Sequence, residues 1–584
     1  MKLKKIKYFP YHIFKKSDGE KSFFILTLIT GVLSAVVAWM FEKSINVFSY
    51  LTYNQGEQGN SFTIDGFLVG SFFVLLSALL SLKYFIGTTG SGVPQIKLAF
   101  IMNRGRTTVK QFIGKFIVST LSLSSGMSFG REGPTLFLTS AIGSFLGQMF
   151  TLSSSKTKAL MAVGASGGLA AAFNTPIAAV IFTLEEIIGD LNTKLLGSII
   201  IASVMASITA WHLHGNHPTF FMTNFQFNDE RELFYYLLIA ILCAVMGSFW
   251  VKSVLYLKTA YQRFFPRAKI LVMYLSFVIT VLISISIPQV IGGGHHVVQE
   301  IFSNEIHTTT LFALIFLAKF FCSALCYSSG ASGGLFVPTL CMGAILGGLV
   351  GSIGHDLSPD FISPISSYAV VGMGAFFAAI IRTPFTSIVM TFEMTHDYKV
   401  IVPLMVSNIV SYLIAERVYP GSVYEKISAH QGIHLPSKKE NEFFENNTVE
   451  DIMRTEKIFF DASETVLQAK EELKEMPSST FCILKNNRLF GLLTRGDIVR
   501  SQNKNEEDEE LHVEDICSKD FITIFPDQNL MMALQKLKRF HVFQLIVVDR
   551  LDPLNVLGII TSESIIRHFG IHTQKEHDSE EIIT

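Results

Sequence analysis

Long apolar stretches without a single charged side chain constrain this chain more than any other feature of its sequence. Residues 22–40, 67–82, 234–251 and 270–290 are charge-free and long enough to cross a bilayer as helices. Of all 584 residues, 49% are hydrophobic and only 16% are charged. A soluble protein of this size carries more charge, so the sequence predicts an integral, multi-pass membrane protein.

The two ends of the chain differ from this apolar region. The N-terminus is rich in lysine and lacks a small-residue cleavage site, so we expect a retained cytoplasmic tail rather than a signal peptide. From Ser437 onward charge is dense and no segment could span a bilayer. The predicted domains are an N-terminal tail (1–21), a membrane domain (22–430), a linker (431–447), two copies of a smaller soluble domain (448–505 and 506–574) and a polar tail (575–584).

The membrane region repeats itself. Residues 164–185 resemble residues 372–393, which lie 208 positions later, and residues 126–134 resemble residues 330–338, which lie 204 positions later. Duplicated halves with Gly/Pro-interrupted helices at matched positions are typical of transporters whose site lies between the repeats. The alternative is that the recurring glycines and alanines only permit close helix packing, which does not explain why the breaks recur together.

The two halves differ in their carboxylates. Glu132 corresponds to Phe336, and Glu186 corresponds to Met394, whereas Glu185 has a counterpart in Glu393. A glutamate present in both halves is more readily explained by structure, as a cap or a network member. A glutamate present in one half only is the better candidate for function.

Glu132 lies in the segment Gly130-Arg131-Glu132-Gly133-Pro134, within apolar surroundings. An ionisable pair in such surroundings costs several kcal/mol unless it lines a cavity or a pathway. Gly before and Pro after predict a break followed by a new helix. The start of a helix attracts anions, and the glutamate occupies the place that an anion would take.

Three broken motifs and one tyrosine together resemble the CLC family of chloride channels and chloride/proton exchangers. The motifs are GSGVP at 90–94, GREGP at 130–134 and GLFVP at 334–338, and Tyr424 follows the last apolar segment. The resemblance implies an all-α polytopic membrane domain of tilted, broken helices in two inverted repeats. It also implies a homodimer with one pathway per subunit, followed by an α+β module of tandem CBS domains on the cytoplasmic side.

The resemblance also implies roles for individual residues. Ser91 and Tyr424 would donate hydroxyls to a central anion, and the backbone N–H groups of Leu335 and Phe336 would complete that site. Such donors suit an ion that must be released again. Without the family, Ser91 could be an ordinary N-cap and Tyr424 an interfacial anchor. Further candidates for lining the pathway are Gly90, Gly92, Gly130 and Arg131.

Two glutamates would handle protons. Glu132 would act as the external gate, because it mimics an anion when ionised and can swing away when protonated. Arg131 beside it would either hold the local field positive or pair with a carboxylate. In the family, exchangers commonly have a glutamate at the position of Glu186, where protons enter from the cytoplasmic side, and many channels have an apolar residue there.

We therefore expect a chloride/proton antiporter in a plasma or inner membrane. A gated chloride channel without proton coupling is the alternative, and a CBS-regulated cation transporter is a remote one. Serine at position 91 is typical of family members that prefer chloride over nitrate. We expect no enzymatic activity, no required cofactor and no nucleic-acid partner, because no nucleophile–base pair and no metal-ligand cluster emerges.

The soluble module also repeats, since residues 449–453 return 64 positions later as residues 513–517. Apolar runs at 480–484 and 544–548 predict strands. The module resembles tandem CBS domains, which often bind adenine nucleotides such as ATP, ADP or AMP. The resemblance implies contacts from Thr494 and Asp497 in the first copy and from Thr561 and Ser564 in the second. A purely structural, dimerising module is the alternative, and Ser564 departs from the family's ribose-binding aspartate.

Two further features invite interpretation. The adjacent histidines His295 and His296 follow three glycines and favour a loop break over a metal site, because adjacent side chains project differently. Lys319 lies inside an apolar run. It either snorkels to the membrane surface or adds positive potential near the pathway.

Overall fold

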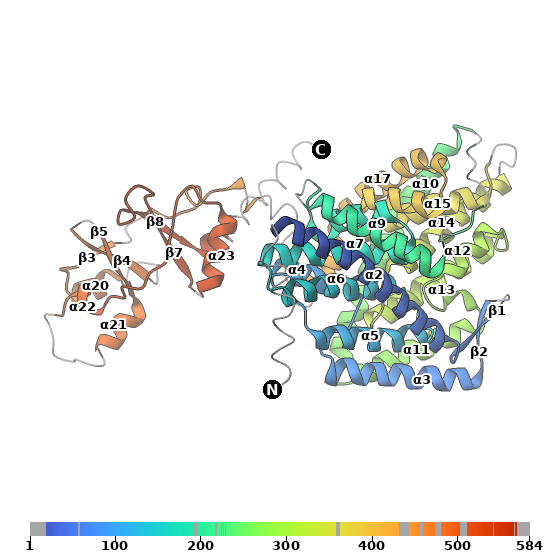
Figure 1. The fold of residues 1–584 in the computed structure, drawn as a ribbon, viewed down its shortest axis with the longest axis horizontal. Coiled ribbons are helices and arrows are strands. Elements are labelled where there is room, and N and C mark those ends of the chain that lie inside the picture. Colours follow the sequence, from blue (N-terminus) through green and yellow to red (C-terminus); the bar gives the residue numbers. More distant parts are fainter. Residues whose placement is uncertain are drawn as a thin grey trace. The chain divides into compact units, whose positions relative to one another are not determined.

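The chain forms two compact units, residues Met1–Leu435 and Pro436–Thr584 (Figure 1). Several predicted segments lie largely outside the described residues, namely the two tails, the linker and the charged run at 503–510. The computed structural model describes residues 19–56, 59–191, 195–215, 219–222, 225, 227, 229–357, 362–430, 443–444, 446–455, 459–473, 480–486, 488–502, 511–540, 542–565 and 567–568.

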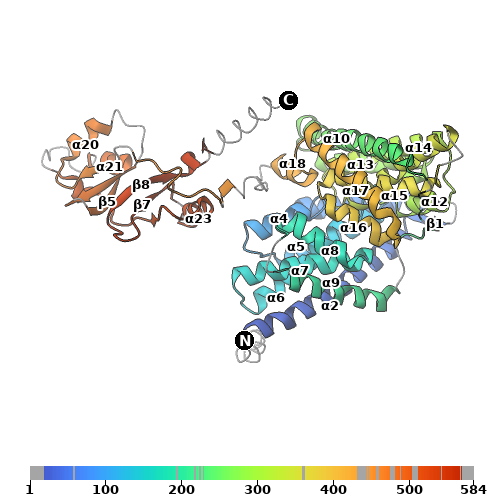
Figure 2. The same ribbon diagram turned by 90° about the horizontal axis from the view of Figure 1, so that it is seen from above.

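The first unit is a bundle of tilted helices of very different lengths (Figures 1 and 2). Within its described residues, seven helices are long and apolar enough to cross a membrane, so the chain is a multi-pass membrane protein. The helices of the first half are α2 (Gly19–Ser49), α3 (Ile64–Leu79), α4 (Val93–Ile101), α5 (Val109–Ser124), α6 (Glu132–Met149), α7 (Ser154–Phe173), α8 (Pro176–Phe182) and α9 (Leu196–His214).

In the first half, the π-helical turns η1 (Leu80–Tyr84) and η2 (Thr183–Ile188) extend α3 and α8. The second half repeats the series of helices. The helices of the second half are α10 (Glu232–Phe264), α11 (Lys269–Ser284), α12 (His295–Phe302), α13 (Thr309–Ser328), α14 (Phe336–Leu357), α15 (Ile365–Ile381), α16 (Pro384–Thr395) and α17 (Ile401–Val418), with short 3-10 turns η3 (Pro288–Val290) and η4 (Tyr398–Val400) and a final helix α18 (Val423–His430).

The predicted duplication is confirmed at the level of the fold, because α2–α9 and α10–α17 follow each other in the same order. The starts of equivalent helices lie between 200 positions (α5 and α13) and 213 positions (α2 and α10) apart. The halves also meet through equivalent residues. Gly130 and Gly334, 204 positions apart, form an isolated antiparallel bridge. An antiparallel pair of equivalent residues implies a local two-fold axis between them, as expected of inverted repeats.

Two equivalent glutamates join the halves a second time. The carboxylate of Glu393 accepts hydrogen bonds from the backbone N–H groups of Ile177 (2.9 Å) and Ala178 (2.7 Å) at the start of α8. Glu185 accepts from the N–H groups of Phe385 (3.4 Å) and Thr386 (2.9 Å) at the start of α16. Each half thereby caps a helix of the other, and carboxylates at helix N-termini are favourable. This agrees with the structural role predicted for the shared glutamates.

The membrane domain is mostly helical, as predicted, and differs from the prediction in two details. The domain is not entirely helical, because β1 (Tyr53–Gly56) and β2 (Gly59–Phe62) form an antiparallel hairpin between α2 and α3. The apolar stretch 270–290 is not a single helix either. Its helix α11 ends at Ser284, because Pro288 cannot continue a helix and starts the turn η3 instead.

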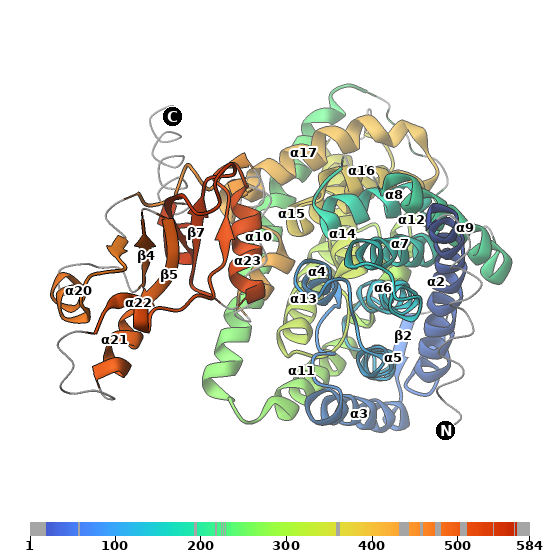
Figure 3. The same ribbon diagram turned by 60° about the vertical axis from the view of Figure 1, so that its left-hand side comes forward.

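The second unit contains two small sheets of the same design, each with a parallel and an antiparallel pair (Figure 3). The predicted strands at 480–484 and 544–548 are confirmed as β4 and β7. The elements are β3 (Phe459–Asp461), α20 (Val466–Leu473), β4 (Thr480–Lys485), β5 (Arg488–Thr494) and α21 (Arg495–Gln502) in the first copy, and α22 (Val513–Ile516), β6 (Thr523–Ile524), α23 (Leu530–Phe540), β7 (Gln544–Val548) and β8 (Val556–Thr561) in the second.

The two copies exchange their opening segments. Arg454 pairs with Ile559 of β8, while Ser518 pairs with Leu492 of β5. Consistent with this, Val449 is buried in the core of the second copy and Val513 in the core of the first. The copies therefore fold as one intertwined module.

Candidate functional site

Glu132 is the first residue of α6, and its side chain is completely buried. Its carboxylate oxygens accept no hydrogen bond of good geometry within the described structure. The backbone N–H groups that act on it are those of Glu132 itself and of Val337, in the first turn of α14. The carboxylate therefore lies where two helix N-termini converge, which is an environment suited to an anion.

Backbone segments approach each other closely around the Glu132 carboxylate. This close approach is the reason why the predicted motifs contain glycines. The amides and carbonyls of Gly130 and Gly334 exchange hydrogen bonds of 2.9 and 2.6 Å. A Cβ atom on Gly133 would lie 2.7 Å from the carbonyl oxygen of Ser91. In the GSG loop, Gly92 has a φ of +105°, a conformation that favours glycine, and its Cβ would lie 2.9 Å from the Gly133 carbonyl oxygen. Gly90 also has a positive φ, of +73°.

Ser91 Oγ and Tyr424 Oη are among the buried hydroxyls that have no hydrogen-bond partner of good geometry within the described residues. Both sequence-based alternatives for them are wrong. Gly92 is the N-cap of α4, so Ser91 is not an ordinary N-cap, and Tyr424 is 0% exposed, so it is not an interfacial anchor. Buried hydroxyls usually find a partner, and two that have none are available to a ligand.

The backbone at the start of α14 is similarly available. The amides of Leu335 and Phe336 donate no hydrogen bond within the described residues. The Phe336 ring packs instead into the core, with its centroid 5.0 Å from that of Phe182 and 4.8 Å from that of Phe377. The side chain is thus used for packing, while the N–H group is left for a ligand.

Glu186 lies in the π-helical turn η2 and is buried. Its Oε1 forms an ion pair of 2.9 Å with Lys97 Nζ on α4, a residue that was not predicted. Glu425, on α18, acts electrostatically on both members of the pair. Tyr424, next to it, interacts electrostatically with both half-specific glutamates, Glu186 and Glu132.

Arg131 pairs with a carboxylate, which was one of the two roles considered for it. Its Nη1 lies 2.6 Å from Oε1 of Glu42 on α2, and His214 Nε2 lies 3.0 Å from the other oxygen of Glu42. The distance from Arg131 Nε to Glu132 Oε1 is longer, at 3.9 Å. Glu42 and His214 were not predicted, since nothing in the sequence connects them to the motif.

Lys319 does not snorkel, because it is 0% exposed. Its Nζ donates to the carbonyls of four consecutive residues, 289–292, most closely to Gly292 at 2.7 Å. Its counterpart 204 positions earlier is Lys115, whose Nζ donates to Thr88 O (3.1 Å) and Gly90 O (2.6 Å). Each half thus has a buried lysine that holds the glycine loop before a short helix, and the interval of 204 could have revealed Lys115.

The predicted nucleotide residues form helix caps in both copies of the C-terminal module. Asp497 Oδ2 accepts from the N–H (2.9 Å) and the hydroxyl (2.6 Å) of Thr494, and its Oδ1 pairs with Arg500. In the second copy, Thr561 N–H donates to Ser564 Oγ at 3.1 Å, and Ser564 N–H donates to Thr561 Oγ1 at 3.0 Å. Serine therefore replaces aspartate without loss of the cap.

Two family models match this chain, one in each of its two units. Residues 72–416 match the family model described as voltage gated chloride channel, and residues 449–504 and 513–570 each match the CBS domain. The chain is 28% identical over 422 residues to the H(+)/Cl(-) exchange transporter ClcA of Vibrio cholerae serotype O1, covering 70% of this chain and 90% of that protein.

Solved structures give the same result. The crystal structure of a slow cyanobacterial Cl-/H+ antiporter matches with a TM-score of 0.63 at 29% identity, over 70% of this chain and 97% of the other. A eukaryotic CLC transporter shares the fold over 93% of this chain and 97% of its own, with a TM-score of 0.66 at 18% identity. The chain belongs to the voltage-gated chloride channel (CLC) family and carries two CBS domains after its membrane domain.

Proposed function

We propose that this protein exchanges chloride for protons across a membrane. The observation that carries the proposal is the placement of Glu132 and Glu186, two buried glutamates that each occur in one half only, within electrostatic reach of Tyr424. A channel needs a gate but no second proton acceptor. Two similar proteins support the proposal, since the Vibrio relative is named as a chloride/proton exchange transporter and the cyanobacterial protein as a chloride/proton antiporter.

The anion would bind to the hydroxyls of Ser91 and Tyr424 and to the amides of Leu335 and Phe336. The Glu132 carboxylate would compete for the space beside them while it is ionised, and would leave it on protonation. Protons would reach Glu132 from Glu186, past Tyr424. Because hydroxyls and amides carry no full charge, they would bind chloride loosely enough to release it.

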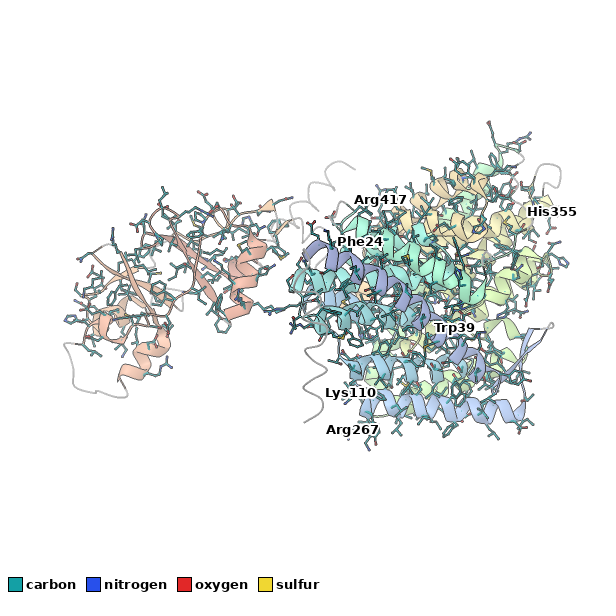
Figure 4. All side chains as sticks on the ribbon, viewed as in Figure 1. Phe24, Trp39, Lys110, Arg267, His355 and Arg417 are labelled. Atoms are coloured by element: carbon teal, nitrogen blue, oxygen red, sulfur yellow. The ribbon has the colours of Figure 1, made fainter. Side chains whose placement is uncertain are left out.

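Sidedness is part of the proposal, and the cations labelled in Figure 4 support it. Lys110, Arg267 and Arg417 lie toward one end of the membrane unit, and His355 lies toward the other (Figure 4). The helices α4 and α18 are at the first of these ends, and α12 is at the second (Figures 1 and 2). By the positive-inside rule, Lys97 and Glu186 would face the cytoplasm and α12 the opposite side, in a plasma or inner membrane.

The test is a simultaneous measurement of chloride and proton flux in proteoliposomes. A chloride gradient should drive protons uphill with the wild-type protein. Glu132→Ala and Glu186→Gln should abolish proton movement while chloride still moves, and Glu305→Gln, at an exposed position, should leave both fluxes unchanged. Chloride flux without proton movement in the wild type would overturn the exchanger and support the channel.

Anion binding at the two hydroxyls can be tested separately from folding. Neither hydroxyl has a hydrogen-bond partner of good geometry within the described residues, although Tyr327 interacts with Ser91. Tyr424→Phe should therefore leave the unfolding temperature nearly unchanged, and Ser91→Ala should lower it only slightly. Each should weaken chloride binding at least about tenfold, since a hydrogen bond to an ion is worth about 1.5–3 kcal/mol. Calorimetric titration with chloride measures this, and unchanged affinity in both variants would exclude the assignment.

The dimer and the nucleotide remain separate proposals. A homodimer is expected from the family and is tested by light scattering of the purified protein.

Adenine nucleotide would bind at Thr494 and Asp497. These two residues already hydrogen-bond to each other in a helix cap, which supports the structural alternative. Titration of the full-length protein with ATP, ADP and AMP distinguishes the two, because no heat with any of them leaves only the structural role.

A further inference from the structure

His295 connects the buried Glu132 to the surface. It is the first residue of α12, and its Nε2 lies 3.9 Å from Glu132 Oε1. That nitrogen is buried and has no hydrogen-bond partner within the described residues. The side chain of His295 is nevertheless 36% exposed, whereas that of Glu132 is 0% exposed. The imidazole of His295 is therefore buried at Nε2, beside the carboxylate, while the rest of the side chain is partly exposed.

The repeat shows that the fold does not require histidine at this position. His295 lies 204 positions after Ser91, and the loops before α4 and α12 are equivalent. The first half has the small hydroxyl of Ser91 here, and the second half has an imidazole. The histidine is thus specific to one half, like Glu132.

The ring is held in place by packing. Its centroid is 5.9 Å from that of Phe220, at an interplanar angle of 31°, and Phe220 is 1% exposed. The charged or titratable groups that act on the ring, besides Glu132, are Arg131 before α6, His296 on α12 and Lys319 on α13. The cations among them would repel a second proton, so the ring would pass on a proton rather than keep it.

We propose that His295 carries the proton between Glu132 and the water on the α12 side of the membrane. The proposal rests on the proposed exchange function and adds the residue through which the proton leaves. Neutral imidazole has one N–H and one lone pair, and we assign the N–H to Nδ1. The gap of 3.9 Å is closed by a small rotation of the carboxyl group or by one water molecule.

The step conserves atoms and charge. The O–H bond of protonated Glu132 breaks, a bond from hydrogen to Nε2 forms, and the ring becomes imidazolium. The Nδ1–H bond then breaks and releases a proton to water, which leaves the Nε2–H tautomer. The ionised Glu132 carboxylate then moves to the anion site, and water takes its place beside Nε2. That water accepts the Nε2 proton while outside water gives a proton to Nδ1, which restores the first tautomer with no further net charge moved. The reverse sequence takes a proton in, and no electrons are transferred.

The test uses His295→Phe, which keeps a ring against Phe220 and removes both nitrogens. In proteoliposomes, coupled proton and chloride flux should fall at least fivefold, and imidazole added on the α12 side should restore part of it. The control is His355→Phe, an exposed histidine at the same end of the membrane unit (Figure 4), which should change neither flux. Size-exclusion profile and unfolding temperature show whether each variant is folded.

A second experiment, in the Glu132→Ala protein, shows whether His295 is a proton carrier or instead an anion ligand or a packing residue. Glu132→Ala moves no protons under the proposed function, so adding His295→Phe to it should leave its chloride flux unchanged. An equal loss of chloride flux in that background would overturn the relay, and so would full coupled flux in folded His295→Phe alone. Wild-type protein that moves chloride without protons would overturn the proposed function and the relay together.

Discussion

Gly130 and Gly334, which occupy equivalent positions in the two halves of the membrane domain, hydrogen-bond to each other through both of their backbone amides. The bridge holds the start of α6 beside the start of α14. Because the two segments are antiparallel, their helix N-termini approach one point from opposite directions, and the carboxylate of Glu132 lies there. Equivalent residues of the two halves thus form one position between helix N-termini, and only the first half places a charged side chain there, Glu132.

Substitution at this contact should be far more damaging than an ordinary Gly→Ala change. A Cβ on Gly334 would lie 2.8 Å from both Gly130 O and Gly133 N, and backbone atoms cannot yield as a side chain can. Gly334→Ala should destabilise the protein by about 1–3 kcal/mol, as overpacking does, and abolish chloride flux. Gly197→Ala, where a Cβ meets nothing within 4 Å, is the control. Normal flux in Gly334→Ala would show that the bridge can be rearranged.

The reciprocal caps should matter for stability and not for coupling. Glu393→Ala would leave the amides of Ile177 and Ala178 without their acceptor, at a cost of about 1–3 kcal/mol. Thermal unfolding in detergent should show the loss, while the remaining folded protein keeps the wild-type ratio of chloride to protons. A changed ratio in folded protein would instead give Glu393 a part in transport.

The ion pair between Lys97 and Glu186 should show strong coupling in a double-mutant cycle. Removing one partner of a buried pair costs about 3–5 kcal/mol, because the other charge is left without its counter-ion. Lys97→Met alone should therefore destabilise the protein clearly. Lys97→Met with Glu186→Met should cost less than the sum of the two single changes. Additive losses would show that the 2.9 Å contact contributes no net energy.

The cap at Asp497 should make the stability of the C-terminal module depend on pH. Burial by itself raises the pKa of Asp497, but hydrogen bonds from Thr494 and the ion pair with Arg500 lower that pKa below its ordinary value overall. A lowered pKa means that the ionised form stabilises the fold above the ordinary pKa, and that this contribution disappears as the pH falls through the folded-state value.

Asp497→Asn should therefore lower the stability of this module by about 0.5 kcal/mol at neutral pH, because it removes the charge that pairs with the exposed Arg500 but keeps an oxygen that can accept from Thr494. The difference from wild type should shrink at pH values below about 4, as followed by thermal unfolding across a pH series. Asp520→Asn, at an exposed carboxylate of the same module, serves as control. If the difference in stability persisted at low pH, the effect would come from the shape of the side chain and not from its charge.

Much of the fold could be predicted because its signals are local. Apolar stretches predicted membrane helices, the intervals of 204 and 208 predicted duplicated halves, and the runs at 480–484 and 544–548 predicted strands. The hairpin β1–β2 was missed because its pairing uses backbone groups, which leave no pattern in the apolar residues around it. The exchange of opening segments between the CBS copies was missed for a similar reason, since Val449 and Val513 are equivalent in sequence and either core could hold them.

The residue pattern along the chain is enough to show a duplicated membrane protein whose halves differ at Glu132 and Glu186. The tertiary structure decided which groups meet those carboxylates, bringing Lys97 to Glu186, Glu42 to Arg131 and His295 to Glu132. The physical reason is that a residue's type and hydropathy can be read along the chain. The partner of a buried charge depends on the packing of helices far apart in the sequence, and no local pattern encodes it.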